Sequence, residues 1–128
     1  MGDRGNIVVR EGKDEVWFYS HWSGSSIGDV VKEALSRRQR WDDAPYLARI
    51  VFDTLTQGEH GGETGFGIWN GVCDNEHDIV VVDVAKQKVE VYDAGNPEAR
   101  GTPLRSTSFE AYAFPKVEAA KSEDPAED

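Results

Sequence analysis

The fold of this chain is decided by residues 79–93, which read IVVVDVAKQKVEVYD. The apolar run over 79–84 is typical of a central strand that is buried on both faces. Residues 85–88 read AKQK and predict a turn, and 89–93 alternate in the manner of a second strand. We therefore predict a β-hairpin here, with its first strand inside a sheet.

Three further strands are predicted before this hairpin. Residues 6–10 and 15–21 predict two strands joined by a turn at 11–14. The second of these strands carries large apolar side chains on both faces, so we expect it to be covered on both sides. A short third strand is expected at 66–69.

Two helices are predicted in the middle of the chain. Apolar residues recur at helical spacing over 27–38, and Ser26 with Asp29 resembles a capping box. The second helix has three terminal signals, which are a cap at Asp42 or Asp43, Pro45 in the first turn and Gly58 at the end. We expect the two helices to form an antiparallel pair.

The order of these elements favours the α+β class. Helices that are grouped rather than alternating with strands predict a mostly antiparallel sheet, here of about five strands. Residues 106–114 fit either a short helix or an edge strand, and both alternatives stay open. We expect one globular domain over 1–115 and an acidic, disordered tail over 116–128.

The net charge argues against two classes of partner, and the cysteine content argues against disulfide bonds. The 128 residues include 14 Lys and Arg against 24 Asp and Glu, which gives a net charge of −10. Such a surface repels nucleic acid and anionic lipid, so we expect neither as a partner. Cys73 is the only cysteine, which excludes an internal disulfide. The chain starts without an apolar signal segment, and we expect a cytoplasmic protein without a cofactor.

The junction between the second strand and the first helix is the candidate ligand site. It consists of His21, Trp22, Ser23, Gly24, Ser25 and Ser26. Free N–H groups and the positive end of a helix dipole can hold phosphate or carboxylate there. The same residues also suit an ordinary helix cap, and the junction lacks the lysine of a phosphate loop.

Catalytic and metal-binding patterns are weak. Serine, histidine and aspartate are present, but the G-x-S-x-G elbow of many hydrolases is not. Acidic neighbours are expected to raise the pKa of Cys73. Residues 73–78 contain ligand types for a metal without the spacing of a calcium loop, and they favour an exposed turn. We expect no catalytic residue and no metal site.

A surface for a protein partner is the other candidate. Four tryptophans are many for so short a chain, and at least one is expected to line a groove or an interface. The candidate residues are Trp41, Asp42, Asp43 and Trp69.

Two functional hypotheses follow from these observations. The first is a non-enzymatic, acidic binding module that acts on a protein partner as an inhibitor or accessory factor. The second is a small-anion or nucleotide-binding protein, hydrolytic or not, that uses the junction at 21–26. The oligomeric state stays open.

Three motifs resemble a family of small uncharacterised proteins from prokaryotic and phage genomes. They are YSHWSG at 19–24, RWDDAPYLARI at 40–50 and TGFG at 64–67. The resemblance spans roughly residues 3–93 and implies an intracellular, stand-alone domain with an accessory or phage–host role. It brings no known activity, so no functional residue is carried over from it.

Overall fold

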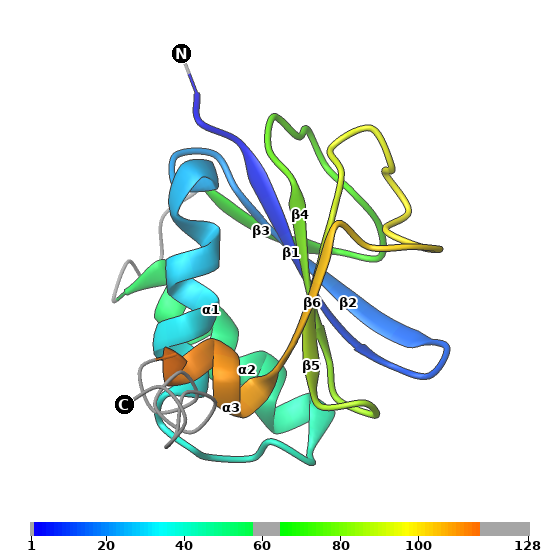
Figure 1. The fold of residues 1–128 in the computed structure, drawn as a ribbon. Helices are drawn as coiled ribbons and strands as arrows, with labels where there is room; N and C mark the ends of the chain where they lie inside the picture. Colours follow the sequence, from blue (N-terminus) through cyan, green and yellow to red (C-terminus); the bar gives the residue numbers. More distant parts are fainter. Residues whose placement is uncertain (1, 58–64, 116–128) are drawn as a thin grey trace, which may run out of the picture.

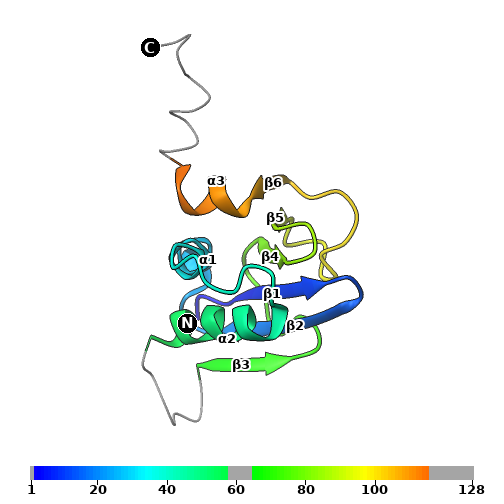
Figure 2. The same ribbon diagram turned by 90° about the horizontal axis from the view of Figure 1, so that it is seen from below.

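A six-stranded sheet is covered on one face by helices in the computed structural model, which describes residues 2–57 and 65–115 (Figure 1). The strands are β1 (Gly5–Glu11), β2 (Asp14–Ser20), β3 (Phe66–Trp69), β4 (Ile79–Asp83), β5 (Lys88–Tyr92) and β6 (Arg105–Ser108). Their order across the sheet is β3-β2-β1-β4-β5-β6 (Figure 2). All neighbours are antiparallel except β1 and β4. The predicted α+β class with a mostly antiparallel sheet is confirmed.

The β4–β5 hairpin forms as predicted and lies in the middle of the sheet. Every residue of β4 is buried, as expected for an apolar run covered on both faces. The parallel pairing of β1 with β4, with Val8 opposite Val81, has no signal in the local sequence. This pairing joins the N-terminal hairpin to the β4–β5 hairpin in one sheet.

The helices are η1 (Gly24–Ser26, a 3-10 turn), α1 (Ile27–Leu35), α2 (Ala44–Thr56) and α3 (Phe109–Ala113). Their apolar sides pack against the same face of the sheet (Figures 1 and 2). The two central helices predicted from spacing are confirmed. The first is shorter than predicted because it ends at Leu35, and Arg38 takes a left-handed backbone conformation with φ of 53°.

Only one of the two predicted helix caps is correct. The Asp43 side chain accepts a hydrogen bond from the Tyr46 N–H at 3.4 Å, which caps α2 as predicted. The predicted capping box of α1 is wrong, because Ser26 makes no side-chain cap hydrogen bond. The helix α2 ends at Thr56, and its predicted end at Gly58 lies outside the described residues.

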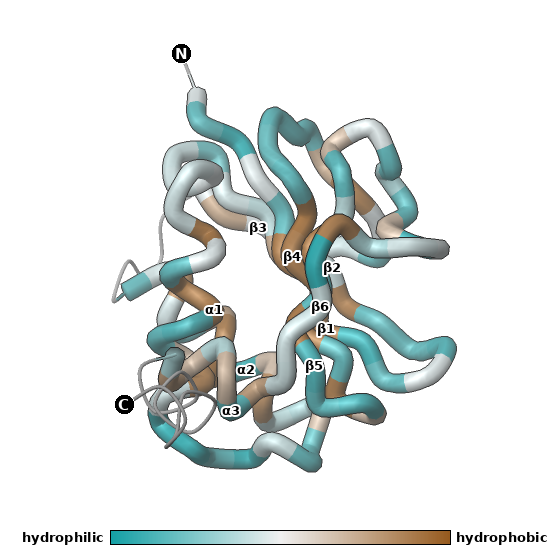
Figure 3. The backbone as a smooth tube through the Cα atoms, in the orientation of Figure 1, coloured by the Kyte–Doolittle hydropathy of each residue, from teal (hydrophilic) through white to brown (hydrophobic). Residues whose placement is uncertain are grey.

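The sheet has apolar cores on both faces. The larger core lies between the sheet and the helices, and the smaller one on the opposite face includes Val8, Val81 and Tyr92. Figure 3 shows hydrophobic residues concentrated along β4, between the two cores. In β2, Phe18 joins the larger core and Trp17 the smaller one, which confirms that this strand is covered on both sides.

Residues 105–113 form a strand and then a helix, so both open alternatives occur in succession. Thr107 of β6 pairs with Val89 of β5. The Ser108 side chain then accepts a hydrogen bond from the Ala111 N–H at 3.1 Å and caps α3. This edge strand brings the sheet to six strands instead of about five.

Within the described part of the chain, no helix is both long enough and apolar enough to cross a bilayer. The predicted acidic tail at 116–128 lies outside the described residues.

Candidate functional site

The junction after β2 holds a carboxylate that comes from the chain itself. Asp3 Oδ2 accepts hydrogen bonds from the Ser25 hydroxyl at 2.6 Å and from the Ser25 N–H at 3.2 Å. The other carboxylate oxygen, Oδ1, lies 2.5 Å from His77 Nε2. An acidic group thus occupies the position at the start of η1 and α1 that favours negative charge. An external anion would have to displace Asp3 to use the same donors.

Gly24 allows the N-terminal segment to pass directly over the junction. Its N–H donates to the Asp3 carbonyl oxygen at 2.6 Å. A Cβ atom on this residue would lie 2.6 Å from the His77 ring and 2.7 Å from the Asp3 carbonyl oxygen. A larger residue would push the segment away, so this glycine serves the packing of the chain on itself.

His21 and Gly24 contact Asp3 through backbone atoms only, since the Asp3 N–H donates to the His21 carbonyl oxygen at 2.7 Å. His21 Nδ1 lies 2.9 Å from the Tyr19 hydroxyl, and the His21 ring meets Trp22 edge-on. Ser23 donates its N–H to the Ser20 hydroxyl oxygen at 3.0 Å. Of the predicted set, Ser25 alone contacts the carboxylate through its side chain among the described hydrogen bonds. Ligand binding at 21–26 stays a prediction.

His77 is a member of this cluster that sequence reasoning does not assign to it. It lies within the 73–78 turn, which Asn6 holds in place. Asn6 Nδ2 donates to the carbonyl oxygens of Cys73 and Asp74 at 3.1 and 3.2 Å. The Asn6 side-chain oxygen accepts the Cys73 N–H at 3.1 Å. These contacts join residues that are separated by 67 to 74 positions in the sequence, and no local pattern can indicate them.

The surroundings of Asp3 and Cys73 shift the pKa values of both groups. Hydrogen bonds from the Ser25 side chain and from His77 hold the pKa of Asp3 below its ordinary value of 3.8. Burial, with help from Asp74, raises the pKa of the Cys73 thiol, in the direction predicted. A thiol with a raised pKa is a poor nucleophile at neutral pH. No cluster of three metal-binding side chains is found in the described ranges.

The four residues predicted to bind a partner lie in different settings. Trp41 is half-buried and packs edge-on against Phe109, with 5.5 Å between ring centroids. Asp43 caps α2, whereas Asp42 beside it is exposed. Trp69 lies on β3 at the edge of the sheet and is 65% exposed. Partner binding by this set stays a prediction, and its exposed members are Asp42 and Trp69.

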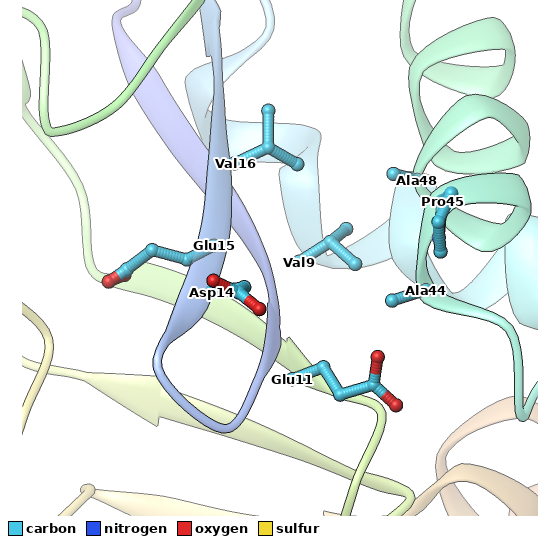
Figure 4. A pocket seen from close by; sticks show the side chains of 8 residues that line it. All are labelled: Val9, Glu11, Asp14, Glu15, Val16, Ala44, Pro45 and Ala48. Carbon is cyan, nitrogen blue, oxygen red and sulfur yellow. The ribbon is translucent and has the colours of Figure 1, made fainter.

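A groove with an apolar floor and an acidic rim lies between the β1–β2 hairpin and the start of α2 (Figure 4). Its volume is about 260 Å³. We call it the acidic groove: the floor is Val9, Val16, Ala44, Pro45 and Ala48, and the rim is Glu11 and Asp14. Figure 4 shows the two valines directed toward α2, while Glu15, which also lines the groove, points to the other side of the hairpin. The wall formed by α2 starts one residue after Asp43.

The two rim carboxylates are directly opposite each other in the hairpin. Glu11 pairs with Asp14 in the register of β1 and β2, and both residues are exposed. Neither forms an ion pair with any residue of the described ranges, although Lys13 lies in the turn between them. Like charges opposite each other destabilise an antiparallel pair. The acidic groove thus offers two unpaired negative charges above an apolar surface.

The opposite face of the sheet carries a buried ion pair. Arg10 and Glu15 lie 3.2 Å apart, with their side chains 8% and 14% exposed. Arg100 contacts the other oxygen of Glu15 at 2.8 Å, and Arg10 Nη1 donates to the Ala99 carbonyl oxygen at 3.0 Å. These contacts hold the segment after β5 against the sheet. Alternation places Arg10 opposite to Val9, but no local signal shows that its face is covered.

No match was found when the chain was compared with protein-family models, with curated proteins and with solved structures.

Proposed function

We propose that this chain is a binding module for a protein partner, and that the partner inserts a lysine or arginine side chain into the acidic groove. The observation that carries the proposal is the pair Glu11 and Asp14. These two carboxylates lack a counter-ion within the described residues and form the rim of the groove above its apolar floor. A long basic side chain fits both parts, because its methylene stem is apolar and its end is charged.

The charge of the whole chain supports a basic partner. A net charge of −10 attracts a positively charged protein surface at long range and speeds the encounter. Asp42, which lies two residues before Ala44 of the groove floor, adds a further exposed carboxylate on the α2 side. A role as inhibitor or accessory factor, as first hypothesised, needs no chemistry beyond this contact. The proposed setting is the cytoplasm, where a lone thiol such as Cys73 stays reduced.

The experiment is an NMR titration with Nα-acetyl-lysine methylamide as the probe. We expect amide shifts confined to 9–16 and 44–48, with a dissociation constant in the millimolar range. The matched probe Nα-acetyl-norleucine methylamide has the same stem without the charge and should bind more weakly. Because screening weakens exposed ion pairs, the lysine probe should also lose affinity as salt is raised.

The charge of the groove is tested with the double variant Glu11→Gln and Asp14→Asn. An exposed ion pair contributes about 0.2–1 kcal/mol, so the loss of two should weaken the lysine probe about 2- to 30-fold. The control is Glu33→Gln, which removes one exposed charge from α1 on another part of the surface. Equal binding of both probes, or an equal loss in the control, would contradict the proposal.

A second candidate function keeps the junction as a small-anion site. The observation that favours it is that Ser25 already holds a carboxylate through its N–H and its hydroxyl. Asp3→Ala would free these donors. A titration of this variant with inorganic phosphate should then shift the Ser25 amide, whereas the unaltered chain should not respond. If phosphate does not shift the Ser25 amide in the Asp3→Ala variant, this candidate function is wrong.

A further inference from the structure

The strand β3 forms one edge of the sheet, and this edge is unlike the other. Among the described residues, β2 is the only strand that pairs with β3. At the opposite edge, β6 reads RSTS and presents polar and charged side chains. β3 reads FGIW and contains no charge and no proline, the residues with which proteins commonly protect an edge from pairing.

The hydrogen-bond phase of β3 shows which of its backbone groups are available. The His21 N–H donates to the Gly65 carbonyl oxygen at 2.8 Å, and the register pairs Tyr19 with Gly67. Inter-strand bonds in an antiparallel pair recur at every second residue. The backbone groups of residues 65, 67 and 69 therefore face β2, whereas those of Phe66 and Ile68 face away from it.

The two-residue turn of the β1–β2 hairpin gives the same assignment of backbone groups that face β2 and groups that face outward. Its closing pair is Glu11 and Asp14, and bonded pairs at every second position then include Phe18 and Ser20 of β2. Trp17 and Tyr19 are thus left to bond β3, in agreement with the hydrogen bond between His21 and Gly65. Two N–H and two C=O groups on the outer edge of β3 are in position to bond a further strand.

The side chains on this edge are large, apolar and exposed. Ile68 is 55% exposed beside Phe18 on the helix side of the sheet, and Trp69 is 65% exposed beside Trp17 on the other side. Exposed apolar groups on both faces of one strand can pack against the two faces of an added strand. Trp22, also exposed, packs on Gly65 at the start of the edge: a Cβ there would clash with its ring.

We propose that β3 is a strand-addition site that receives an extended segment of a protein partner. Backbone bonds to Phe66 and Ile68 would supply the pairing, and Ile68 and Trp69 would supply the apolar contacts. The proposal rests on the proposed function in one respect, that the chain binds a protein. A second copy of the chain fits less well, because two bodies with a charge of −10 repel each other.

The partner segment should carry an aromatic residue at its centre. Tyr19 covers Gly67 from the β2 side, and among the described residues nothing else lies within 4 Å of a Cβ placed on this glycine, so its outer side is open. An aromatic side chain from a neighbouring strand shields such an edge glycine. A basic residue at each end of the segment suits the acidic chain. The probe is therefore the capped peptide Lys-Thr-Val-Tyr-Val-Thr-Lys.

The experiment is amide hydrogen exchange, read residue by residue with and without this peptide. With the peptide at about ten times its dissociation constant, exchange at Phe66 and Ile68 should slow about tenfold. Exchange at Gly67 and Trp69, whose N–H groups face β2, should change little. Addition of the peptide should also quench or shift the tryptophan fluorescence of the unaltered chain. The Trp69→Leu variant, which lacks the tryptophan at this edge, should show a smaller change.

Proline at position 68 tests the backbone contact directly. Because the Ile68 N–H faces outward, Ile68→Pro removes a donor of the free edge without removing a bond to β2. Protection at Phe66 should be lost in this variant and retained in Ile68→Thr, which keeps the N–H. Protection of Gly67 and Trp69 in both variants shows that β3 is still paired with β2.

Three results would overturn the proposal. The first is strong protection of Phe66 and Ile68 without peptide at every protein concentration, which means that the chain covers its own edge. The second is protection that rises with protein concentration, which identifies a second copy as the occupant. The third is unchanged peptide affinity in Ile68→Pro. The groove variant Glu11→Gln with Asp14→Asn should still protect Phe66 and Ile68, so failure here is distinguishable from failure of the acidic groove.

Discussion

At the scale of single residues, Asp3 shows how a distant side chain can take over a local task. The first turn of α1 lacks a side-chain cap from its own serine. Asp3, 22 positions before Ser25, accepts hydrogen bonds from the Ser25 N–H and hydroxyl in η1, the turn that leads into α1, and also contacts His77. One carboxylate thereby ties the N-terminal segment, the start of α1 and the turn before β4 together.

The substitution Asp3→Asn should destabilise the fold at neutral pH and have little effect in strong acid. Hydrogen bonds lower the pKa of Asp3 below 3.8, so its contribution is fully present above that ordinary value. The contribution is lost as the pH falls through the lowered pKa, where the carboxylate is protonated in the folded state too. Melting temperatures of both proteins between pH 2 and 7 should therefore converge at the acidic end. A constant difference across this range would show that the charge of Asp3 is irrelevant.

The control for this experiment is Asp29→Asn. Asp29 is an exposed acid in the first turn of α1, and none of the described side-chain hydrogen bonds involves it. Its substitution should therefore change the pH profile less than Asp3→Asn does.

At the scale of secondary-structure elements, β4 carries the sheet. It lies between the parallel partner β1 and the antiparallel partner β5. Val82 belongs to the core under the helices and Val81 to the core on the opposite face, and both are fully buried. The strand therefore contributes to both layers at once.

We expect Val81→Ala and Val82→Ala to destabilise the protein by about 1–3 kcal/mol each. The loss combines the transfer of two methyl groups with the cavity that they leave. Urea denaturation measures the change, and the slope of the transition should stay the same. Lys13→Ala in the exposed turn is the control. If neither valine variant changes the midpoint, the two-sided burial of β4 is wrong.

At the scale of the whole molecule, the two faces of the sheet are covered in different ways. Helices cover one face, and the segment between β5 and β6 contributes Ala99 to the other (Figure 1). Arg10 is the main polar link on that second face, because it contacts Glu15 and the carbonyl oxygen of Ala99. A buried pair of this kind fixes a geometry more than it adds stability.

Arg10→Met should loosen the segment after β5. Removal of one partner from a buried ion pair costs about 3–5 kcal/mol, and we expect the lower end because Arg100 still contacts Glu15. Tryptic cleavage after Arg100 should be faster in this variant, measured beside its thermal denaturation. The double variant Arg10→Met with Glu15→Gln should recover part of the loss.

The control for Arg10→Met is Arg49→Met. Arg49 is paired with Asp53 on the exposed side of α2, with its side chain 75% exposed. Such a surface pair contributes little, so this variant should melt close to the unaltered protein. An equal loss in both variants would contradict the special role of Arg10.

The local sequence pattern predicts most of the helices and strands, but it does not predict the candidate sites. Alternation and helical spacing identify β1 to β5 and the two central helices, because burial of one face imposes a period on the sequence itself. The start of α2 was also readable, since Asp43 and Pro45 act within one turn. For residues 106–114 the local sequence fits both a short helix and an edge strand. Pairing with β5 in the folded chain places a strand before the helix.

Residue types and neighbours along the chain are enough to predict the α+β class, the buried β4–β5 hairpin and the acidic charge. Three features become visible only in the folded chain: β1 and β4 run parallel, Asp3 contacts Ser25 and His77, and β3 lies at an edge of the sheet. The acidic groove belongs to the same group, because its floor joins the hairpin at 9–16 to α2. The physical reason is that such contacts join segments far apart in the chain, where only the packing of the whole determines which groups meet.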